Sequence, residues 1–328
     1  MAVLLDVLYS GAIGGIDGWW GELTNSTNTR EKCYQYGQFL GNRWKNRGNV
    51  IWVFSGDLTP PGGSEGEARL LEIHRGLRDA GATQLATAHT GASMVSSDWT
   101  AFRPFLGLNG VYPGGTPTYA YLESRSAYRA SPPIPVFLLE PGYEAEGWTE
   151  PGVPAAVRRY AWWGQLSGIA GVMYGHRDVW PFQTATWNAG YPFGSQDWHL
   201  SLGAPGAQAM EHMSQLLSGL PWQELVPSGL AGMKTLVTAG ASSGNAFVTA
   251  AATPSGSLLV AYLPTANPGT VTIDMTALSG AVTARWWDPT SAQLTSIGAL
   301  PNTGTQSFTV PGTNAGGNRD WLLVLTSP

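Results

Sequence analysis

Charged residues and cysteine are scarce in this chain of 328 residues. Only 12% of the residues are Asp, Glu, Lys or Arg, and the formal net charge is −5. Such a chain without a basic cluster is a poor partner for nucleic acid, whose phosphates attract Lys and Arg. The single cysteine, Cys33, excludes an internal disulfide and a zinc site built from several cysteines. The apolar runs are much shorter than the roughly 20 residues of a membrane helix, so we expect no membrane partner.

Aromatic residues, in contrast, are abundant, with 15 Trp and 12 Tyr. Aromatic rings present large apolar faces with a polar edge, and such faces stack on the apolar sides of sugar rings. In a weakly charged acidic chain, this excess favours carbohydrate binding. Tryptophan also fills ordinary cores, so only residues on loops after strands distinguish the two roles. On that basis we expect sugar stacking from Trp19, Trp20, Trp148 and Trp180.

Strands and helices alternate through the first two thirds of the chain. We expect strands at 1–9, 49–54, 84–88, 105–111, 135–140 and 169–174, and helices at 29–44, 65–79, 154–167 and 204–217. This alternation indicates a parallel sheet. Polar or aromatic residues at nearly every strand end favour an α/β barrel of the TIM type over a doubly wound sheet. No Gly-x-Gly-x-x-Gly pattern follows any strand, which argues against a nucleotide site.

Two of these strands end in an acid. An apolar run leads into Glu140 and the turn that follows it, and a similar run at 49–54 leads to Asp57. In an α/β barrel the catalytic side chains lie at the carboxyl ends of the strands. Glycoside cleavage needs a proton donor for the leaving oxygen and a second carboxylate at the reacting carbon. We therefore expect Asp57 and Glu140 to form a catalytic pair; the alternatives are a turn residue at Asp57 and an ion pair of Glu140 with Arg177.

Further substrate contacts are expected from strand ends and the loops after them, namely Trp19, Trp20, His89, Tyr112, Glu144, His176 and Trp180. Tyr112 could orient Glu140 through a hydrogen bond, and Glu144 could support Glu140 or replace it. Each of these residues is equally compatible with a role in the core or at the rim. His176, Asp178 and Asp197 could be assembled into a metal site, but their spacing is not diagnostic. We expect no metal and no cofactor.

The character of the chain changes after residue 226. Helical periodicity stops, and seven short strands are expected at 234–237, 246–251, 258–263, 270–275, 283–288, 306–310 and 321–325. Short strands with frequent turn residues indicate an antiparallel β-sandwich. We therefore predict two domains, 1–226 and 227–328.

The predicted barrel is incomplete, because six strands are expected where a closed barrel needs eight. The first strand begins at the first residue, and no charged segment or cleavage site of a signal peptide precedes it. The two absent βα units would come before this strand. A homodimer in which a second copy compensates for them is therefore a partner to test.

Both halves together resemble the apiosidase-like glycoside hydrolases, in which a (β/α)8 catalytic domain precedes a β-sandwich named as a collagen-binding domain. The resemblance is carried by residues 49–57, 135–144, Tyr174-Gly175 with Trp180 and Phe182, 259–264, 284–289 and 320–325. It covers nearly the whole chain. Relatives carry about two more βα units before the strand that begins this sequence.

The resemblance also implies roles for the two acids. The acid after the fourth barrel strand acts as acid/base and the Glu that ends the seventh acts as nucleophile, which are Asp57 and Glu140 here. We expect a glycosidase of complex, plant-type polysaccharide side chains, secreted or periplasmic, with retention if the carboxylates lie about 5–5.5 Å apart. Asp57 should bind a proton more readily than Glu140. The alternative is a carbohydrate-binding or structural protein without catalysis; for the β-sandwich we expect a structural role.

Overall fold

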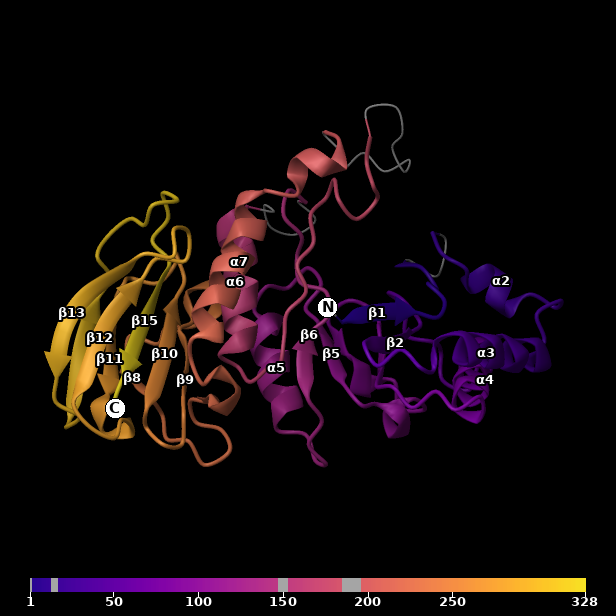
Figure 1. Ribbon diagram of the computed structural model, residues 1–328, viewed down its shortest axis with the longest axis horizontal. Helices are drawn as coiled ribbons and strands as arrows, with labels where there is room; N and C mark the ends of the chain where they lie inside the picture. The colour runs from indigo at the N-terminus through magenta and orange to yellow at the C-terminus, as the bar shows by residue number, and fades with distance from the viewer. Residues whose placement is uncertain (1, 13–16, 147–152, 185–195) are drawn as a thin grey trace. The chain divides into compact units, whose positions relative to one another are not determined.

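The computed structural model describes residues 2–12, 17–146, 153–184 and 196–328. Its contacts divide the chain into two compact units (Figure 1). The first unit comprises Met1–Tyr112 and Ala130–Leu139, and the second comprises Pro113–Arg129 and Glu140–Pro328. No described helix is both long and apolar enough to cross a membrane.

A parallel sheet forms the centre of the first unit. Strands β1 (Val3–Asp6), β2 (Val50–Phe54) and β3 (Ala86–Ala88) lie in that order, and both pairs are parallel. The side chains of β2 are mostly buried, as expected for an apolar run in the middle of a parallel sheet. The strands predicted at 1–9, 49–54 and 84–88 are therefore confirmed, with shorter bounds.

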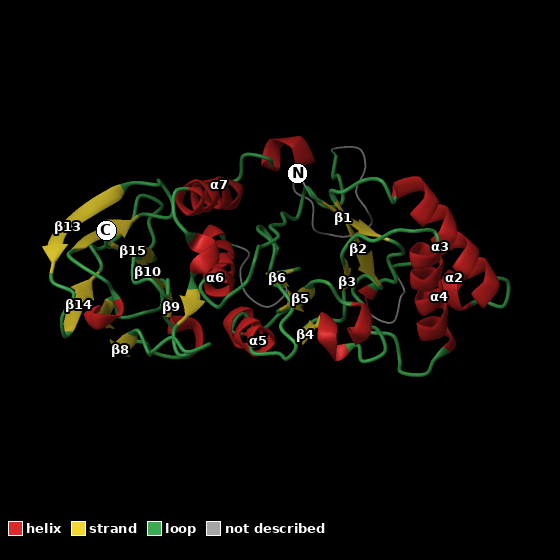
Figure 2. Ribbon diagram, turned by 60° about the horizontal axis from the view of Figure 1, so that its bottom comes forward, coloured by secondary structure: helices red, strands yellow, loops and turns green. Residues whose placement is uncertain are grey.

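Two long helices pack together in this unit, α3 (Arg30–Trp44) and α4 (Glu65–Asp79), and Figure 2 shows them side by side. A Cβ atom on Gly37 of α3 would lie 2.1 Å from the Ile73 carbonyl oxygen, so the two backbones nearly touch there. Helix α4 begins after Ser64, whose hydroxyl accepts a hydrogen bond from the Glu67 backbone N–H. The short helix α2 (Trp20–Thr24) precedes them.

A second, smaller sheet completes the first unit. Strand β5 (Asn109–Tyr112) pairs antiparallel with β4 (Met94–Val95) and parallel with β6 (Val136–Leu138). Gly107 and Leu108, just before β5, both donate backbone hydrogen bonds to the Ala86 carbonyl of β3. The short 3-10 helices Ser96–Asp98 and Arg103–Phe105 lie between the strands. The strand expected at 105–111 is found, but it begins later.

Among the described residues of the second unit are the α-helices α5 (Tyr119–Tyr128), α6 (Pro154–Gln165) and α7 (Pro205–Ser218). The helices predicted at 154–167 and 204–217 are confirmed as α6 and α7, whereas α5 was not predicted. The strand predicted at 169–174 is wrong, because in the described part of the chain this segment belongs to no strand. It follows Gly168, which has φ +96, and Val172 is its one bridge residue; a further isolated bridge joins Glu144 and His176. A short apolar run alone does not guarantee a partner strand.

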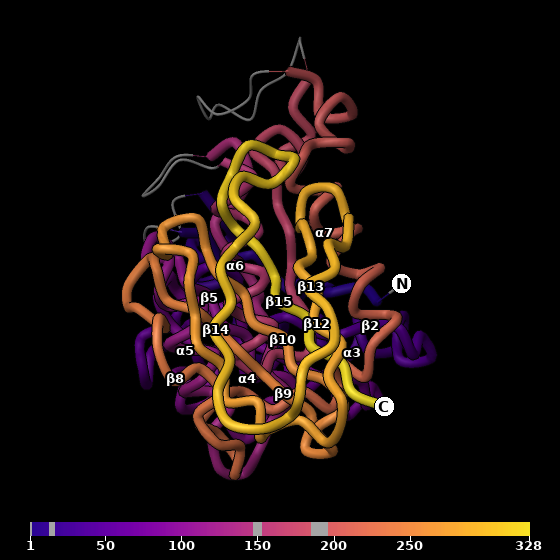
Figure 3. The backbone as a smooth tube through the Cα atoms, turned by 90° about the vertical axis from the view of Figure 1, so that its left-hand side faces the viewer, coloured from indigo at the N-terminus to yellow at the C-terminus, as the bar shows by residue number. Residues whose placement is uncertain are grey.

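The chain after residue 225 forms two antiparallel sheets, here called the C-terminal sheets (Figure 3). The larger has the order β13 (Leu294–Leu300), β12 (Val282–Trp287), β15 (Trp321–Thr326), β10 (Leu258–Leu263), β9 (Thr249–Ala252) and β7 (Val226–Pro227). The smaller has the order β14 (Thr305–Thr309), β11 (Thr270–Asp274) and β8 (Val237–Ala239). Short 3-10 helices occur at Trp198–Ser201, Trp222–Glu224, Gly244–Ala246 and Met275–Ala277.

One hydrophobic core is shared by the two C-terminal sheets. The larger sheet contributes Leu259, Ala261 and Leu263 of β10, and the smaller contributes Ile273 and Phe308. Successive residues of a strand point to opposite faces, so these three β10 residues share one face. Antiparallel sheets were predicted for this region and are confirmed; β13 was missed because most of its side chains are exposed.

Helix α6 covers the other face of β10. The Trp162 ring lies 6.5 Å from that of Tyr262 on β10 and 5.7 Å from that of Trp287 on β12, measured between centroids. The Trp163 indole N–H donates to the Phe247 carbonyl at 2.8 Å. Because both faces of β10 are covered, all six of its residues are buried.

A buried ion pair fixes the same helix to the C-terminal sheets. The Arg158 guanidinium donates to both carboxylate oxygens of Asp320, at 2.8 and 2.9 Å, and the two side chains are 3% and 0% exposed. Asn314 donates to the same carboxylate at 2.9 Å, and Tyr262 does so at 3.3 Å. Asn318 accepts from Arg158 at 2.8 Å. A buried charge is tolerated when its partners are this complete.

Removing one partner of this pair should therefore destabilise the protein strongly. We expect Arg158→Ala and Asp320→Ala each to lower the free energy of unfolding by about 3–5 kcal/mol, since the remaining charge stays buried and unpaired. Lys234→Ala, which removes an exposed pair with Asp274, should cost about 1 kcal/mol or less. Thermal and urea unfolding measure both effects. Equal losses in the buried-pair variants and in the Lys234 control would contradict the assignment.

Candidate active site

The carboxyl ends of the strands in the first unit carry a group of polar side chains. Asp6 is the last residue of β1 and Tyr112 the last of β5, while His89 directly follows β3. Asp57 comes three residues after β2. Carboxyl ends of parallel strands meet at one edge of a sheet, which is where α/β enzymes place their reactive groups.

The backbone between β2 and Asp57 is strained. Ser55, Gly56 and Asp57 have φ values of 83, 63 and 60, and only the glycine adopts this region without steric cost. The Ser55 hydroxyl donates to the Leu58 carbonyl and helps to hold the turn. A Cβ atom on Gly56 would lie 2.7 Å from an Asp6 carboxylate oxygen. Non-glycine residues with positive φ, here Ser55 and Asp57 on either side of Gly56, cluster at functional sites.

Asp57 and His89 lie together. Their ligand atoms, a carboxylate oxygen and an imidazole nitrogen, are within 4.8 Å of each other. The His89 backbone N–H donates to the Phe54 carbonyl at 2.8 Å, and its ring lies 5.1 Å from the Tyr112 ring. An acid beside an imidazole can transfer protons, and the same two groups can also contribute to a metal site. The structure thus brings together three residues predicted separately.

Asp6 also lies at this edge of the sheet, although it was not among the residues predicted from the sequence. Its carboxylate accepts a hydrogen bond from the Leu8 backbone N–H at 3.1 Å. Burial raises the pKa of Asp6 to about 6, while the Leu8 hydrogen bond and the charge of His89 act in the opposite direction. As at Glu140, an apolar run leads into the acid. At Asp6, however, the apolar residues Val7 and Leu8 follow, so the sequence does not show that the strand ends at Asp6.

Glu140 is the first residue of the second segment of the second unit, Glu140–Pro328. Its peptide bond joins it to Leu139, which is buried just after β6, so the chain reaches Glu140 at the carboxyl end of that strand. The Glu140 residue itself is partly exposed. The role predicted for its carboxylate stays a prediction.

Glu144 has a different environment, since it is only 4% exposed. Its carboxylate accepts from the Gly206 backbone N–H at 2.9 Å and from the Tyr174 hydroxyl at 2.6 Å. Gly206 lies in the first turn of α7, where a negative charge interacts favourably with the helix dipole. Burial, together with this carboxylate, raises the pKa of the Tyr174 hydroxyl well above its usual range. These contacts make Glu144 an anchor for the start of α7.

His176 and Asp178 form a second buried cluster in this unit. The His176 Nδ1 atom accepts from the Asp178 backbone N–H at 3.1 Å and lies 3.9 Å from an Asp178 carboxylate oxygen. The Ser201 hydroxyl donates to the Asp178 carboxylate at 3.0 Å. These bonds tie the loop after Glu144 to the segment before α7. Asp197 immediately precedes the 3-10 helix that contains Ser201.

The tryptophans predicted to stack on sugars have different surroundings. Trp19 is 60% exposed, and Trp180 is also exposed, with its indole N–H donating to Glu146 at 2.7 Å. Trp20 instead packs on α4, because a Cβ atom on Gly66 would lie 2.1 Å from its ring. Trp148 lies outside the described residues. Exposed rings are available to a ligand, whereas Trp20 contributes to packing.

The raised pKa of Asp6 predicts a dependence of stability on pH. The folded state holds the Asp6 proton up to about pH 6, whereas a free aspartate releases it near 3.8, so stability should fall as the pH rises from about 4 to 6. The shift corresponds to at most about 3 kcal/mol. Asp6→Asn should remove this component and make the protein more stable at pH 7. Glu31→Gln, at an exposed site on α3, should leave the pH profile of the melting temperature unchanged. Parallel profiles for wild type and Asp6→Asn would show that burial does not raise this pKa.

Similar proteins were found by sequence and by structure. Residues 1–224 match the family model described as "Apiosidase-like, catalytic domain", and residues 234–326 match "Putative collagen-binding domain of a collagenase". No curated protein sequence matched the chain.

Three solved structures share the fold. A protein described as "Glycoside hydrolase" aligns with a TM-score of 0.77 at 23% identity, over 91% of this chain and 69% of its own. A family 5 glycoside hydrolase from Bacteroides vulgatus gives the same score and identity over 91% and 67%. A third, also described as a glycoside hydrolase from Bacteroides vulgatus, aligns with a TM-score of 0.56 at 14% identity, over 99% and 59%.

The match to the catalytic-domain model spans more than half of the chain and includes every predicted site residue. The chain therefore belongs to the apiosidase-like family of glycosidases.

Proposed function

We propose that the protein is a retaining glycoside hydrolase that acts on the side chains of complex, plant-type polysaccharides. Asp57 is the acid/base and Glu140 the nucleophile. The observation that carries this proposal is the strained turn after β2, which holds Asp57 beside His89 at the carboxyl ends of parallel strands. Glu140 follows β6, a parallel strand of the same unit, which supports its assignment as the second carboxylate.

The reaction proposed for these residues has two steps. The Glu140 carboxylate attacks the anomeric carbon and forms a covalent glycosyl-enzyme, while the Asp57 carboxyl gives its proton to the departing oxygen. Asp57 then accepts a proton from water, which attacks the same carbon and releases Glu140. His89, with its imidazole near Asp57, and Asp6, which packs against Gly56 next to Asp57, set the electrostatic surroundings of the acid/base.

The substrate contacts form two groups in this proposal. His89, Tyr112, Trp19 and Trp180 contact the sugar, and the exposure of the two tryptophan rings supports stacking. Trp20, Glu144 and His176 support the site indirectly, since the contacts described above for these side chains are with other parts of the protein. No metal or cofactor takes part in the proposed steps.

We also propose that residues 1–226 form the catalytic domain, a TIM-type barrel, and that 227–328 form a β-sandwich. The family-model matches at 1–224 and 234–326 support this division. The contacts of α6 with Tyr262, Trp287 and Asp320 support a structural role for the C-terminal sheets. By its family, the proposed enzyme is secreted or periplasmic.

Changing either acid should abolish turnover without unfolding the protein. We expect Glu140→Ala and Asp57→Asn each to lower kcat by about three orders of magnitude or more on a polysaccharide that the wild type cleaves. Release of reducing sugar measures the rate, and the melting temperature reports folding. Glu211→Gln, an exposed carboxylate on α7, should retain full activity. A loss of less than tenfold in Glu140→Ala would exclude the nucleophile role.

Rescue by a small anion tests the retaining mechanism separately. If Glu140 is the nucleophile, azide should restore cleavage by Glu140→Ala and yield a glycosyl azide of inverted configuration, because it occupies the space of the missing carboxylate. Proton NMR of the wild-type product should show retained configuration. An inverted wild-type product would replace the proposal with direct attack by water. Binding of polysaccharide without any cleavage by the wild type would favour the non-catalytic alternative.

A further inference from the structure

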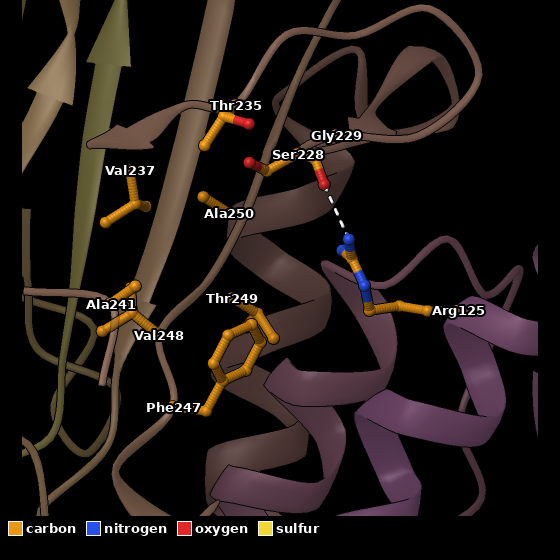
Figure 4. Close-up of a pocket in the computed structure, with 10 residues that line it drawn as sticks. All are labelled: Arg125, Ser228, Gly229, Thr235, Val237, Ala241, Phe247, Val248, Thr249 and Ala250. Carbon is orange, nitrogen blue, oxygen red and sulfur yellow. Dashed lines mark hydrogen bonds between the residues drawn. The ribbon is translucent and has the colours of Figure 1, made fainter. Parts of the chain in front are cut away.

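A small cavity in the second unit carries a cation and a buried hydroxyl that the glycosidase proposal does not use. It has a volume of about 200 Å³ and lies where α5 meets β8, β9 and the loop after β7 (Figure 4). Its polar walls come from Arg125, Ser228, Thr235 and Thr249, and Phe247 supplies an aromatic wall. None of these residues belongs to the strand ends of the first unit.

Arg125 enters the cavity from α5. One of its terminal nitrogens donates to the Ser228 carbonyl at 2.8 Å, as Figure 4 shows, and a guanidinium has five N–H donors in all. No carboxylate within the described ranges pairs with Arg125. Burial, followed by the charge of Arg129, lowers the pKa of Arg125, as expected for a desolvated cation without a counter-ion. Such a group gains most from an anion that reaches it.

The buried hydroxyl of Thr249 is a second group that a ligand could hydrogen-bond. It is 1% exposed, and its hydroxyl oxygen has no hydrogen-bond partner among the residues that the structure describes. On β9 it pairs with Tyr262, so its side chain lies on the face of the sheet that Tyr262 presents to Trp162 of α6. Leaving a buried hydroxyl unpaired costs about 1–3 kcal/mol, and a hydroxyl that lines a cavity can be satisfied from inside it.

The remaining walls limit the size and type of ligand. Phe247 stacks on Tyr121 with ring centroids 4.4 Å apart, so this wall is rigid and apolar. The Ser228 hydroxyl accepts from the Leu236 backbone N–H at 2.9 Å, which leaves its own hydrogen to be donated. A space of this volume takes the equivalent of roughly seven water molecules and is therefore too small for a polymer or a nucleotide. One cation fits a ligand with one negative charge.

We propose that this cavity binds a small carboxylate of at most monosaccharide size. Arg125 pairs with the carboxylate, the hydroxyls of Thr249 and Ser228 hydrogen-bond to polar groups of the ligand, and Phe247 contacts its apolar side. The carboxylate could belong to a sugar acid or to a simple organic acid, since both offer the same group to Arg125. The site is separate from Asp57 and Glu140 in the sequence, and the inference does not depend on the glycosidase activity.

Titration calorimetry on the full chain tests this with three probes, D-glucuronate, acetate and D-glucose, up to about 10 mM. Saturable binding of glucuronate without binding of glucose supports the carboxylate site. Binding of acetate equal to that of glucuronate assigns the site to simple organic acids, and tighter binding of glucuronate assigns it to sugar acids. Equal binding of glucose and glucuronate, or no binding of either acid, overturns the proposal.

Two variants locate the binding. Arg125→Met should weaken binding of the acid at least tenfold, and Thr249→Val should weaken it about fivefold, the effect of one hydrogen bond. Thr249→Val should leave the melting temperature unchanged or raised, because it removes an unpaired buried hydroxyl, so this variant remains informative if Arg125→Met fails to fold. Arg47→Met and Thr238→Val make the same changes at exposed positions outside the cavity and should bind as the wild type does. If Thr249→Val binds the acid as tightly as the wild type, and a folded Arg125→Met does so as well, the proposed site is wrong.

Discussion

The structure of the second unit depends on one buried ion pair, between Arg158 of α6 and Asp320 before β15. Both side chains are almost completely removed from solvent, and each charge is matched by several hydrogen bonds. A hydrophobic contact tolerates small shifts of a helix along a sheet, but a bidentate charged pair does not. Slipping α6 by one turn would leave two buried charges unpaired. The pair therefore selects one position for α6, and the surrounding Trp162 and Tyr262 rings pack in the register that this position fixes.

That constraint explains why the compact units differ from the division suggested by composition. The change of character near residue 226 is real, since antiparallel sheets follow it, yet α5, α6 and α7 group with those sheets. Helix α6 is buried on nearly all sides, and its sequence does not show which elements cover it. The cavity proposed to bind a small carboxylate also lies between these helices and the C-terminal sheets, where Arg125 of α5 donates to the Ser228 carbonyl. Helices that support a catalytic domain thus also provide walls for a second site.

Elements with strong local signals were predictable from the sequence. Helix α4 was predicted with its observed bounds, since Ser64 caps its first turn and its apolar positions keep helical spacing. Strand β10, buried on both faces, is a continuous apolar run and was also predicted with its observed bounds. Helix α5 was missed, because no side chain caps its start and its segment lacks a clear apolar period. The run at 169–174 is apolar enough for a strand, but pairing depends on a neighbour that the local sequence does not reveal.

The residues of the candidate site were likewise predictable only where the local sequence carries a signal. The acids at the ends of apolar runs identified Asp57 and Glu140, but Asp6 escaped because Val7 and Leu8 prolong its run beyond the point where β1 ends. Nor does the sequence reveal that Ser55 shares the left-handed backbone of Gly56 and Asp57, since serine has no preference for that region. Gly56 has no Cβ atom, and this allows Asp6 to pack against the turn that carries Asp57. The surroundings of Asp57 therefore arise from a backbone conformation held by neighbouring strands, and a conformation of that kind appears only once the fold has formed.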